Sequence, residues 1–194
     1  EIGSRRVERP GAPFFARRNA RQGEPTVEKG FYTQDDIREI VSYAMTRHIE
    51  VIPEIEFPAH SDEVFIGYPE LCCTGKPYTS GEFCAGNERT YTFMENVLTE
   101  IIDLFPSEYI HIGGDEARKI AWKTCSKCQT LMEKEGLKDL EELQCYMIAR
   151  MEAFLTSKGK RMIGWDEVLN NHLAPTSTII SYRGQETASE AANR

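Results

Sequence analysis

The sequence predicts an α/β fold in which helices cover a parallel β-sheet. Amphipathic helical segments alternate with short apolar strands at least three times along the chain, an order that is typical of parallel sheets. The strands are apolar runs rich in β-branched residues, as expected when a sheet is covered on both faces. With 194 residues, of which 40% are hydrophobic and 28% charged, the chain is the size of one domain with a sizeable core.

The chain divides into an irregular beginning and a regular remainder. Residues 1–30 are rich in Arg, Gly and Pro and show no helical or strand periodicity, which predicts a long loop or an N-terminal arm. The regular pattern occupies residues 31–194. Because the chain opens with Glu1, without an initiating Met or an apolar signal segment, we expect it to be an excised piece of a larger protein.

The first half of the regular part predicts a helix, a strand and a second helix. Thr33 and Asp36 have the spacing of a capping box, and the apolar residues that follow predict a helix over about 34–48. The run "IEVIPEI" then predicts a buried strand. After a long loop, a second amphipathic helix carries apolar residues from Phe93 to Phe105 and is ended by Pro106.

The second half repeats the alternation. "YIHIGG" predicts the second strand, and a segment that is helical in pieces follows it and closes on Gly136 as a C-cap. Apolar residues from Leu140 to Leu155 predict a third helix that ends near Gly159. "RMIGW" and "TIISY" predict two further short strands.

Polar and aromatic residues follow each strand at its carboxyl end, where parallel sheets and barrels place their functional groups. We expect these side chains to share one rim: His60, Asp115, Glu116, Trp165, Asp166, Glu167, Tyr182 and Arg183.

The adjacent carboxylates Asp115 and Glu116 follow Gly113 and Gly114, whose missing Cβ atoms allow a sharp turn or a close approach to a ligand. A solvated turn is the alternative for so short a motif. Trp165 and Tyr182 could serve as core residues, or offer the flat faces on which sugars stack while their hydroxyls bond to carboxylates.

Carboxylates beside aromatic rings favour glycoside chemistry, in which a carboxylic acid protonates the leaving oxygen. Asp115 would raise the pKa of Glu116 by like-charge repulsion and keep that proton available. Two adjacent residues are poorly placed to flank one glycosidic carbon, as the nucleophile and acid of an ordinary retaining enzyme do. The nucleophile would therefore come from elsewhere.

Three motifs identify a family resemblance. "HIGGDEA" resembles the signature of glycoside hydrolase family 20, the β-N-acetylhexosaminidases, while "VIPEIEFPAHS" and "IGWDEV" resemble that family's preceding and following strands. The resemblance runs from Phe31 to about Gly184. It implies a (β/α)₈ TIM-barrel enzyme that removes terminal β-linked N-acetylglucosamine or N-acetylgalactosamine without a cofactor. The chain would be a partial barrel covering about strands 3 to 6 of that domain.

The resemblance also implies roles for five residues. Glu116 would be the general acid/base, and Asp115 would orient and stabilise the 2-acetamido group of the substrate, whose oxygen acts as the nucleophile through an oxazolinium intermediate. His60 would be the pocket histidine and Trp165 a wall of the acetamide pocket. Tyr182 stands where the family usually has a second tryptophan.

The sequence departs from the family pattern in three respects. Ala59 replaces the usual glycine before the pocket histidine, which forbids only unusual backbone angles. Tyr182 shrinks the pocket wall and adds a hydroxyl. The family's first and last strands have no counterpart here, so two sheet edges would be left unpaired. On that ground we expect self-association, as a two-fold dimer whose half-barrels complete one another. The truncation itself leaves open whether the fragment is fully active, weak or inactive.

The six cysteines leave the redox compartment open. Cys72, Cys73 and Cys84 could form a covalent staple in their loop. Cys125 and Cys128 form a lone CxxC, which with Cys145 could be imagined as a zinc site. No second CxxC or HxxxH completes four ligands, so a structural pair or buried free thiols is the favoured interpretation and no metal is expected.

Charge excludes some partners. The formal net charge of -8 and the sequence pI of about 5.2 imply repulsion from nucleic acid and from anionic lipid, and no apolar run approaches a membrane span. The expected partner is a glycan that contains N-acetylhexosamine. The family's usual work outside the cytoplasm, together with the cysteine count, predicts a periplasmic or extracellular location.

Two rival functions remain open. The chain could be a non-catalytic glycan-binding remnant, because the missing strands carry much of the sugar-holding apparatus. A metal-dependent barrel hydrolase could use His60, His111, Asp115 and Glu116 as ligands, although no HxH or HExxH spacing is present. The sequence leaves the linkage and the preference between gluco and galacto configuration undetermined.

Overall fold

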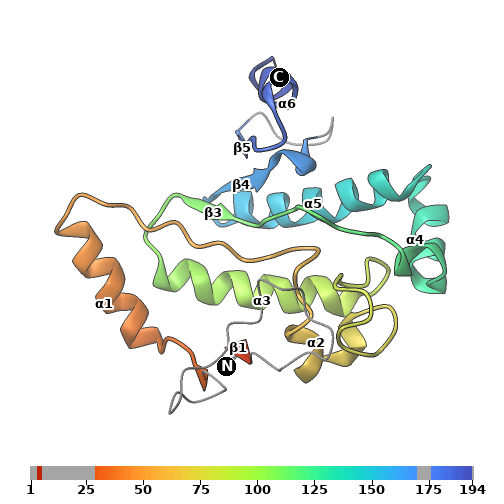
Figure 1. The fold of residues 1–194 in the computed structure, drawn as a ribbon, viewed down its shortest axis with the longest axis horizontal. Coiled ribbons are helices and arrows are strands. Elements are labelled where there is room, and N and C mark those ends of the chain that lie inside the picture. Colours follow the sequence, from red (N-terminus) through yellow and green to blue (C-terminus); the bar gives the residue numbers. More distant parts are fainter. Residues whose placement is uncertain (1–3, 6–28, 170–175, 194) are drawn as a thin grey trace, which may run out of the picture.

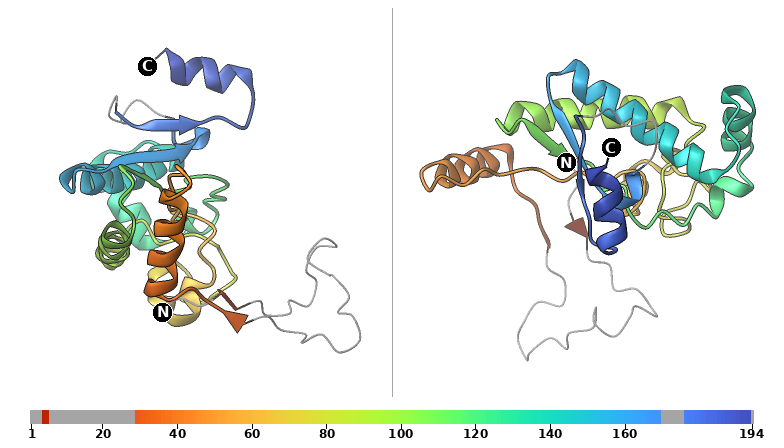
Figure 2. Two further views of the ribbon diagram at one scale, coloured as in Figure 1. Left: turned by 90° about the vertical axis from the view of Figure 1, so that its left-hand side faces the viewer. Right: turned by 90° about the horizontal axis from the view of Figure 1, so that it is seen from above.

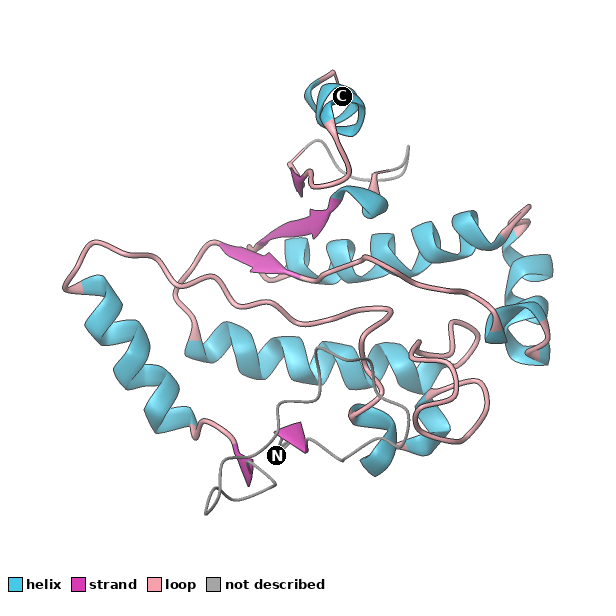
Figure 3. Ribbon diagram, in the orientation of Figure 1, coloured by secondary structure: helices cyan, strands magenta, loops and turns pink. Residues whose placement is uncertain are grey.

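The computed structural model describes residues 4–5, 29–169 and 176–193. Within these ranges, short parallel strands lie against two long helices, and long loops connect the elements (Figure 1). The strands are short compared with the helices and loops, as the colouring of Figure 3 shows. Among the described residues, no helix is both long enough and apolar enough to span a bilayer.

The three expected long helices are confirmed. Helix α1 spans Gln34–Met45, a little shorter than expected, and begins at a complete capping box between Thr33 and Asp36. Helix α3 spans Glu88–Leu104 and ends where Phe105 leaves the helical conformation, just before Pro106. Helix α5 spans Leu140–Ser157, with the Asp139 carboxylate accepting a hydrogen bond from the Glu142 amide at its N-terminus.

The remaining helices are short. The segment expected to be helical in pieces consists of the 3₁₀ turn η3 (Ala121–Lys123) and helix α4 (Ser126–Glu135). Gly136 caps α4 in the left-handed conformation with φ of 68°, as the sequence predicts. The other short helices are α2 (Val64–Gly67), η2 (Pro69–Leu71), η4 (Asp166–Val168) and α6 (Gln185–Ala192).

The main sheet is parallel, in the order β3–β4–β5. Strand β3 spans Tyr109–His111, β4 spans Arg161–Trp165 and β5 spans Thr178–Ile180. Tyr109 aligns with Arg161 and Gly164 with Ile179. All three strands coincide with, or lie within, the runs that the sequence predicts.

The strand expected from "IEVIPEI" is reduced to one bridge, between Glu54 and His111. The chain still runs parallel to β3 here, since the Ile55 amide donates to the His111 carbonyl at 2.8 Å and the Phe57 amide to the Ile112 carbonyl at 2.9 Å. Pro53 has no N–H to donate, which interrupts the ladder at its beginning. The expected strand is therefore wrong in extent and right in position and direction.

Most of the N-terminal arm lies outside the described residues. Its two ends form an antiparallel pair, in which β1 (Ser4–Arg5) aligns with β2 (Lys29–Gly30). The sequence expectation of a region without strands is wrong for these two dipeptides. Two residues a side carry too little pattern to be recognised in a sequence.

The core lies where α3 and α5 pack beside each other on one side of the strands, as two perpendicular views agree (Figure 2). Fully buried side chains from both helices and from η3 fill this space, among them Tyr91, Leu98, Met147, Ile148 and Trp122. A smaller cluster joins α1 to the end of α3 through Val41, Leu104 and Phe105. Loop and turn segments follow the carboxyl ends of the strands.

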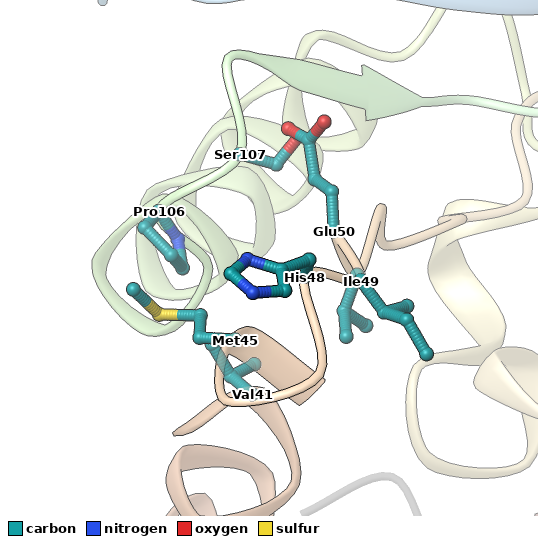
Figure 4. A pocket seen from close by; sticks show the side chains of 8 residues that line it. Val41, Met45, His48, Ile49, Glu50, Pro106 and Ser107 are labelled. Carbon is teal, nitrogen blue, oxygen red and sulfur yellow. The ribbon is translucent and has the colours of Figure 1, made fainter. Parts of the chain in front are cut away.

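A hollow of about 380 Å³ lies beside the smaller cluster (Figure 4). Its lining comes from the end of α1, the segment after it and the residues before β3, including Met45, His48, Glu50 and Ser107. The Ser107 hydroxyl donates to Glu50 across it at 2.7 Å. None of the sequence-predicted site residues lines this hollow.

Candidate active site

Three of the predicted site residues meet beyond the carboxyl end of β3. The Nε2 atom of His60 lies 3.3 Å from Oδ2 of Asp115 and 3.4 Å from Oε2 of Glu116. Glu116 is the most open of the three side chains, at 65% exposure, while Asp115 is 17% exposed. Both carboxylates therefore converge on one imidazole nitrogen at the surface.

The two glycines before the carboxylates lie so close to neighbouring side chains that an added Cβ atom would clash with them. Gly113 and Gly114 have φ of +68° and +98°, a region that side chains other than hydrogen rarely allow. A Cβ atom on Gly113 would lie 2.3 Å from Oε2 of Glu56, and one on Gly114 would lie 2.0 Å from Cγ1 of Val168. The two glycines thus let the chain pass close to other protein groups.

Hydrogen bonds hold the same turn from two sides. The side-chain amide of Gln144, on α5, donates to the Gly114 carbonyl at 2.8 Å. The amide of Glu116 donates to Oε2 of Glu167 at 2.6 Å. The turn that carries the paired carboxylates is therefore fastened both to the helical layer and to the segment after β4.

His60 and Glu116 both occupy the left-handed region, with φ of 52° and 51°. A non-glycine residue in that conformation costs about 1 kcal/mol or more and persists where surrounding contacts enforce it. Ala59 is not among the residues with positive φ and is buried. The alanine in place of the family's glycine is therefore accommodated without strain.

Glu56 is a site residue that the sequence analysis missed. Burial raises the pKa of its carboxyl to about 7, and the negative charges of Asp115 and Glu54 add to that effect while His60 opposes it. A carboxyl with a pKa raised toward neutrality beside Asp115 is a candidate for a functional group. Its only sequence signal is its place two residues after Glu54, on the same side of the extended segment.

Trp165 and Tyr182 lie together as expected. Their ring centroids are 5.6 Å apart in an edge-to-face arrangement. The Trp165 indole N–H donates to Glu54 at 3.0 Å, and the Tyr182 hydroxyl donates to Glu167 at 2.5 Å. The Tyr182 hydroxyl is therefore hydrogen-bonded within the site. It links the aromatic pair to Glu167, the residue that also accepts from the Glu116 amide.

Asp166 and Arg183 do not face the rim as the sequence analysis expected. Asp166 is fully buried, and its Oδ1 atom accepts from the Arg183 guanidinium at 2.8 Å. Burial would raise the pKa of Asp166, but hydrogen bonds from Thr187, Arg183 and Ser181 outweigh it and hold the pKa below its usual range. These residues fasten the segment after β5 to η4.

His111 is also separate from the carboxylate pair. It is buried, and burial lowers the pKa of its imidazole. Its Nδ1 atom lies 3.0 Å from the Gly113 amide nitrogen and 3.1 Å from Oε1 of Glu54. The four-ligand metal set that the sequence analysis considered is therefore not assembled, although His60, Asp115 and Glu116 have one donor atom each within 4.8 Å of one another.

The cysteines group differently from the two sets considered from the sequence. The Sγ atoms of Cys73, Cys84, Cys125 and Cys128 all lie within 4.8 Å of one another. Cys72 and Cys145, both within described residues, lie outside this thiol cluster. All six thiols are free, so the proposed covalent staple among Cys72, Cys73 and Cys84 is absent here.

A parallel α/β sheet that presents two carboxylates, a histidine and an aromatic pair beyond its carboxyl ends is typical of barrel-type glycoside hydrolases. Comparison with known proteins gives the family. The sequence profile named glycosyl hydrolase family 20, catalytic domain, matches residues 4–194, and the chain belongs to that family.

Relatives and solved structures agree with this assignment. The beta-hexosaminidase of Porphyromonas gingivalis is 44% identical over 180 residues, which are 89% of this chain and 23% of the relative. The beta-N-acetylhexosaminidase of Bacteroides fragilis superposes with a TM-score of 0.78 at 36% identity, covering 88% of this chain and 35% of that one.

A third match carries a sugar. The exo beta-N-acetylglucosaminidase of Vibrio harveyi, solved in complex with N-acetylglucosamine, gives a TM-score of 0.78 at 33% identity and covers 87% of this chain and 28% of that one. The chain therefore spans roughly a quarter to a third of the proteins it resembles. Its fold is an α/β part of a TIM-barrel-type catalytic domain.

Proposed function

We propose that this chain carries the acid/base centre of a retaining exo-β-N-acetylhexosaminidase. The observation that carries the proposal is the convergence of Asp115 and Glu116 on one nitrogen of His60, at 3.3 and 3.4 Å. Carboxylates that meet on one atom lie side by side and leave no room for a sugar ring between them. This arrangement suits an enzyme whose nucleophile is supplied by the substrate.

In the proposed mechanism Glu116 protonates the leaving glycosidic oxygen and later takes a proton from water. Its high exposure gives the leaving group access from solvent. The acetamido oxygen of the substrate attacks the anomeric carbon as the glycosidic bond breaks, which yields an oxazolinium ion. Water then opens that ring at the same face, so the anomeric configuration is retained.

Asp115 is proposed to accept a hydrogen bond from the acetamido N–H and to stabilise the positive charge of the oxazolinium ion. Its lower exposure makes its charge count for more than that of a fully solvated carboxylate. Glu56 lies beside Asp115, and with its pKa raised to about 7 it can take up or release a proton near neutral pH. We propose His60 as the group that orients both carboxylates.

Trp165 and Tyr182 are proposed to form the wall of the acetamide pocket. The edge-to-face pair presents apolar ring surface, and the hydrogen bonds to Glu54 and Glu167 fix the rings in place. A stiff apolar wall would hold the methyl group of the acetamide and press its oxygen toward the anomeric carbon.

We further propose that the extended segment at Glu54 and strands β3, β4 and β5 correspond to strands 3 to 6 of an eight-stranded barrel. The two outer edges would then require partners, from a longer polypeptide or from a second copy that completes the barrel. Light scattering at micromolar concentration tests self-association, and a monomer contradicts it. A periplasmic or extracellular location also stays a proposal, for which free-thiol titration under denaturing conditions is a first test.

Substrates with and without the acetamide test the role of Asp115. We expect Asp115→Asn to lower the release of nitrophenol from nitrophenyl N-acetyl-β-glucosaminide far more than from the corresponding β-glucoside. The reason is that only the first substrate offers the amide that Asp115 is proposed to hold. An equal loss on both sugars would contradict this role.

The same assay separates the rival functions. Sugar binding without turnover would favour a glycan-binding remnant. Turnover that stops at once on addition of a chelator would favour a catalytic metal held by the exposed set of His60, Asp115 and Glu116. Turnover that continues in chelator supports the substrate-assisted mechanism.

A further inference from the structure

The thiol cluster brings together two cysteines of the long loop before α3 and two at the start of α4. Sγ of Cys73 lies 3.6 Å from Sγ of Cys128, and Sγ of Cys84 lies 3.7 Å from Cys125 and 3.8 Å from Cys128. Cys84 and Cys128 are buried, while Cys73 and Cys125 are half-buried. Four soft donors that face one another in the protein interior form an unusual grouping unless something binds them.

The distances distinguish a metal site from disulfides. A disulfide holds its sulfur atoms about 2.03–2.05 Å apart, far below the spacings found here. Zinc binds thiolates at about 2.3 Å in a tetrahedron, whose geometry sets the sulfur atoms about 3.8 Å from each other. The three closest pairs already match the edges of that tetrahedron, and the others lie within 4.8 Å. We propose that Cys73, Cys84, Cys125 and Cys128 bind one Zn²⁺ ion as a structural tetrathiolate site.

The backbone next to the thiol cluster is packed unusually closely, at Gly86. A Cβ atom on Gly86 would lie 2.1 Å from the Lys127 carbonyl oxygen and 2.6 Å from the Cys128 amide nitrogen. The chain after Cys84 is thereby pressed against the first turn of α4. The close approach therefore packs the loop that carries Cys84 directly against the helical turn that carries Cys128.

The place of the CxxC pair fits the same assignment. Cys125 is the N-cap residue of α4 and Cys128 lies in its first turn, so both sulfurs sit at the positive end of a helix. That end stabilises thiolates, the form in which cysteine binds metal. Cys84 is held from the other side, because its amide donates to the Leu71 carbonyl at 2.7 Å. Binding one Zn²⁺ would release the thiol protons to solvent.

The site would act as a cross-link. Cys73 and Cys84 belong to the long loop that also carries His60, while Cys125 and Cys128 follow the segment that carries Asp115 and Glu116. In Figure 1 the loop before α3 and the start of α4 lie next to each other at one end of the molecule. A metal with four protein ligands has no open position for substrate, so its contribution is to hold these two loops together.

Metal content and cysteine variants test the proposal. The chain is purified without added chelator, and its zinc is measured by mass spectrometry of the elements alongside its thermal unfolding. We expect about one zinc per chain, its loss in Cys128→Ser with a lower unfolding temperature, and its retention in the control Cys145→Ser, whose thiol lies outside the cluster.

A second measurement avoids variants that fail to fold. The unaltered chain, stripped of metal under reducing conditions, is titrated with Co²⁺. A tetrahedral tetrathiolate gives intense charge-transfer absorption in the near ultraviolet and strong visible bands, and Zn²⁺ should displace them at one equivalent. A folded chain that holds no zinc and gives no such absorption would overturn the proposal. Two disulfides among these cysteines, found by thiol titration of the chain as purified after it is denatured without reductant, would overturn it too.

Discussion

Two side-chain clusters join the same pair of loops, and they do so in opposite environments. Near the sheet, His60 meets Asp115 and Glu116 in a surface group whose side chains are between 17% and 65% exposed. Farther along the same loops, Cys73 and Cys84 meet Cys125 and Cys128 in a group that is buried or half-buried. The first cluster is open to a ligand, whereas the second is enclosed.

The difference suggests that one cluster fixes the two loops in place and the other carries the proposed chemistry. A catalytic acid must exchange its proton with substrate and solvent, and the exposure of Glu116 is consistent with the role proposed for it. Long loops, however, lose entropy when they are fixed, and something must offset that cost. We infer that the enclosed thiol cluster fixes the loops, and that the strained residues His60 and Glu116 depend on that support.

The largest expected effect comes from the open cluster. In a preparation of this protein that hydrolyses nitrophenyl N-acetyl-β-glucosaminide, Glu116→Gln should lower the rate by about 10²–10⁴-fold, the usual loss for a general acid. The melting temperature should change little, because the Glu116 side chain is mostly exposed. Steady-state kinetics and thermal unfolding of the same preparation measure both quantities.

Glu133→Gln is the matched control, since Glu133 is an exposed glutamate on α4. It should leave both rate and stability unchanged. Full activity in Glu116→Gln would remove that residue from the mechanism. A large fall in its melting temperature would instead show that the open cluster also holds the loops, and the comparison between the two clusters would fail.

A middle-sized effect compares glycines beside the two clusters. Gly86→Ala places a Cβ atom against the backbone of Lys127, which cannot move aside, and should lower the free energy of unfolding by about 1–3 kcal/mol. Gly113→Ala meets the flexible end of Glu56 instead and adds strain at positive φ. We expect Gly113→Ala to lower turnover more than stability, because the added methyl group displaces the carboxylate of Glu56.

Gly136→Ala controls for backbone strain, because Gly136 has φ of +68° like Gly113 but no atom within 4 Å of the added Cβ. Chemical denaturation should show a loss of about 1 kcal/mol for this variant. If Gly86→Ala were no more destabilising than the control, the tight packing at the thiol cluster would have no energetic consequence. That result would weaken the contrast between an enclosed and an open cluster.

The smallest effect concerns the pH dependence of stability at the open cluster. The pKa of Glu56 is raised to about 7 in the folded chain, above its ordinary value of 4.5. The folded state thus binds the proton more tightly, so this group favours folding at low pH and loses that contribution as pH rises from about 4.5 through about 7. Glu56→Gln should therefore melt higher than the unaltered chain at pH 8, with the advantage shrinking toward pH 5.

Melting temperatures of both proteins across this pH range provide the measurement, and only their difference is used, because other carboxylates titrate in both. Glu133→Gln again serves as the control for replacing a glutamate by glutamine. A difference of opposite sign would mean that Glu56 is stabilised as a carboxylate. The open cluster would then hold a fixed charge where we infer an exchangeable proton.

Local sequence signals predicted most of the secondary structure correctly. The capping box at Thr33, the glycine cap at Gly136 and the apolar period from Leu140 each act within a few residues, and all three are confirmed. The strand expected at "IEVIPEI" was overestimated, because its apolar pattern ignored the missing N–H of Pro53. Family motifs placed His60, Asp115 and Glu116 near one another, which the geometry confirms.

By itself, the sequence determined the order of helices and parallel strands, the family, and the rim on which the acid pair would lie, since these follow from local pattern and from motifs. Only the tertiary structure decided which distant residues meet. It turned Asp166 inward to Arg183, set Glu56 beside Asp115, and joined the CxxC pair to Cys73 and Cys84. Such contacts depend on how two loops pack, and residue spacing along one chain does not encode that packing.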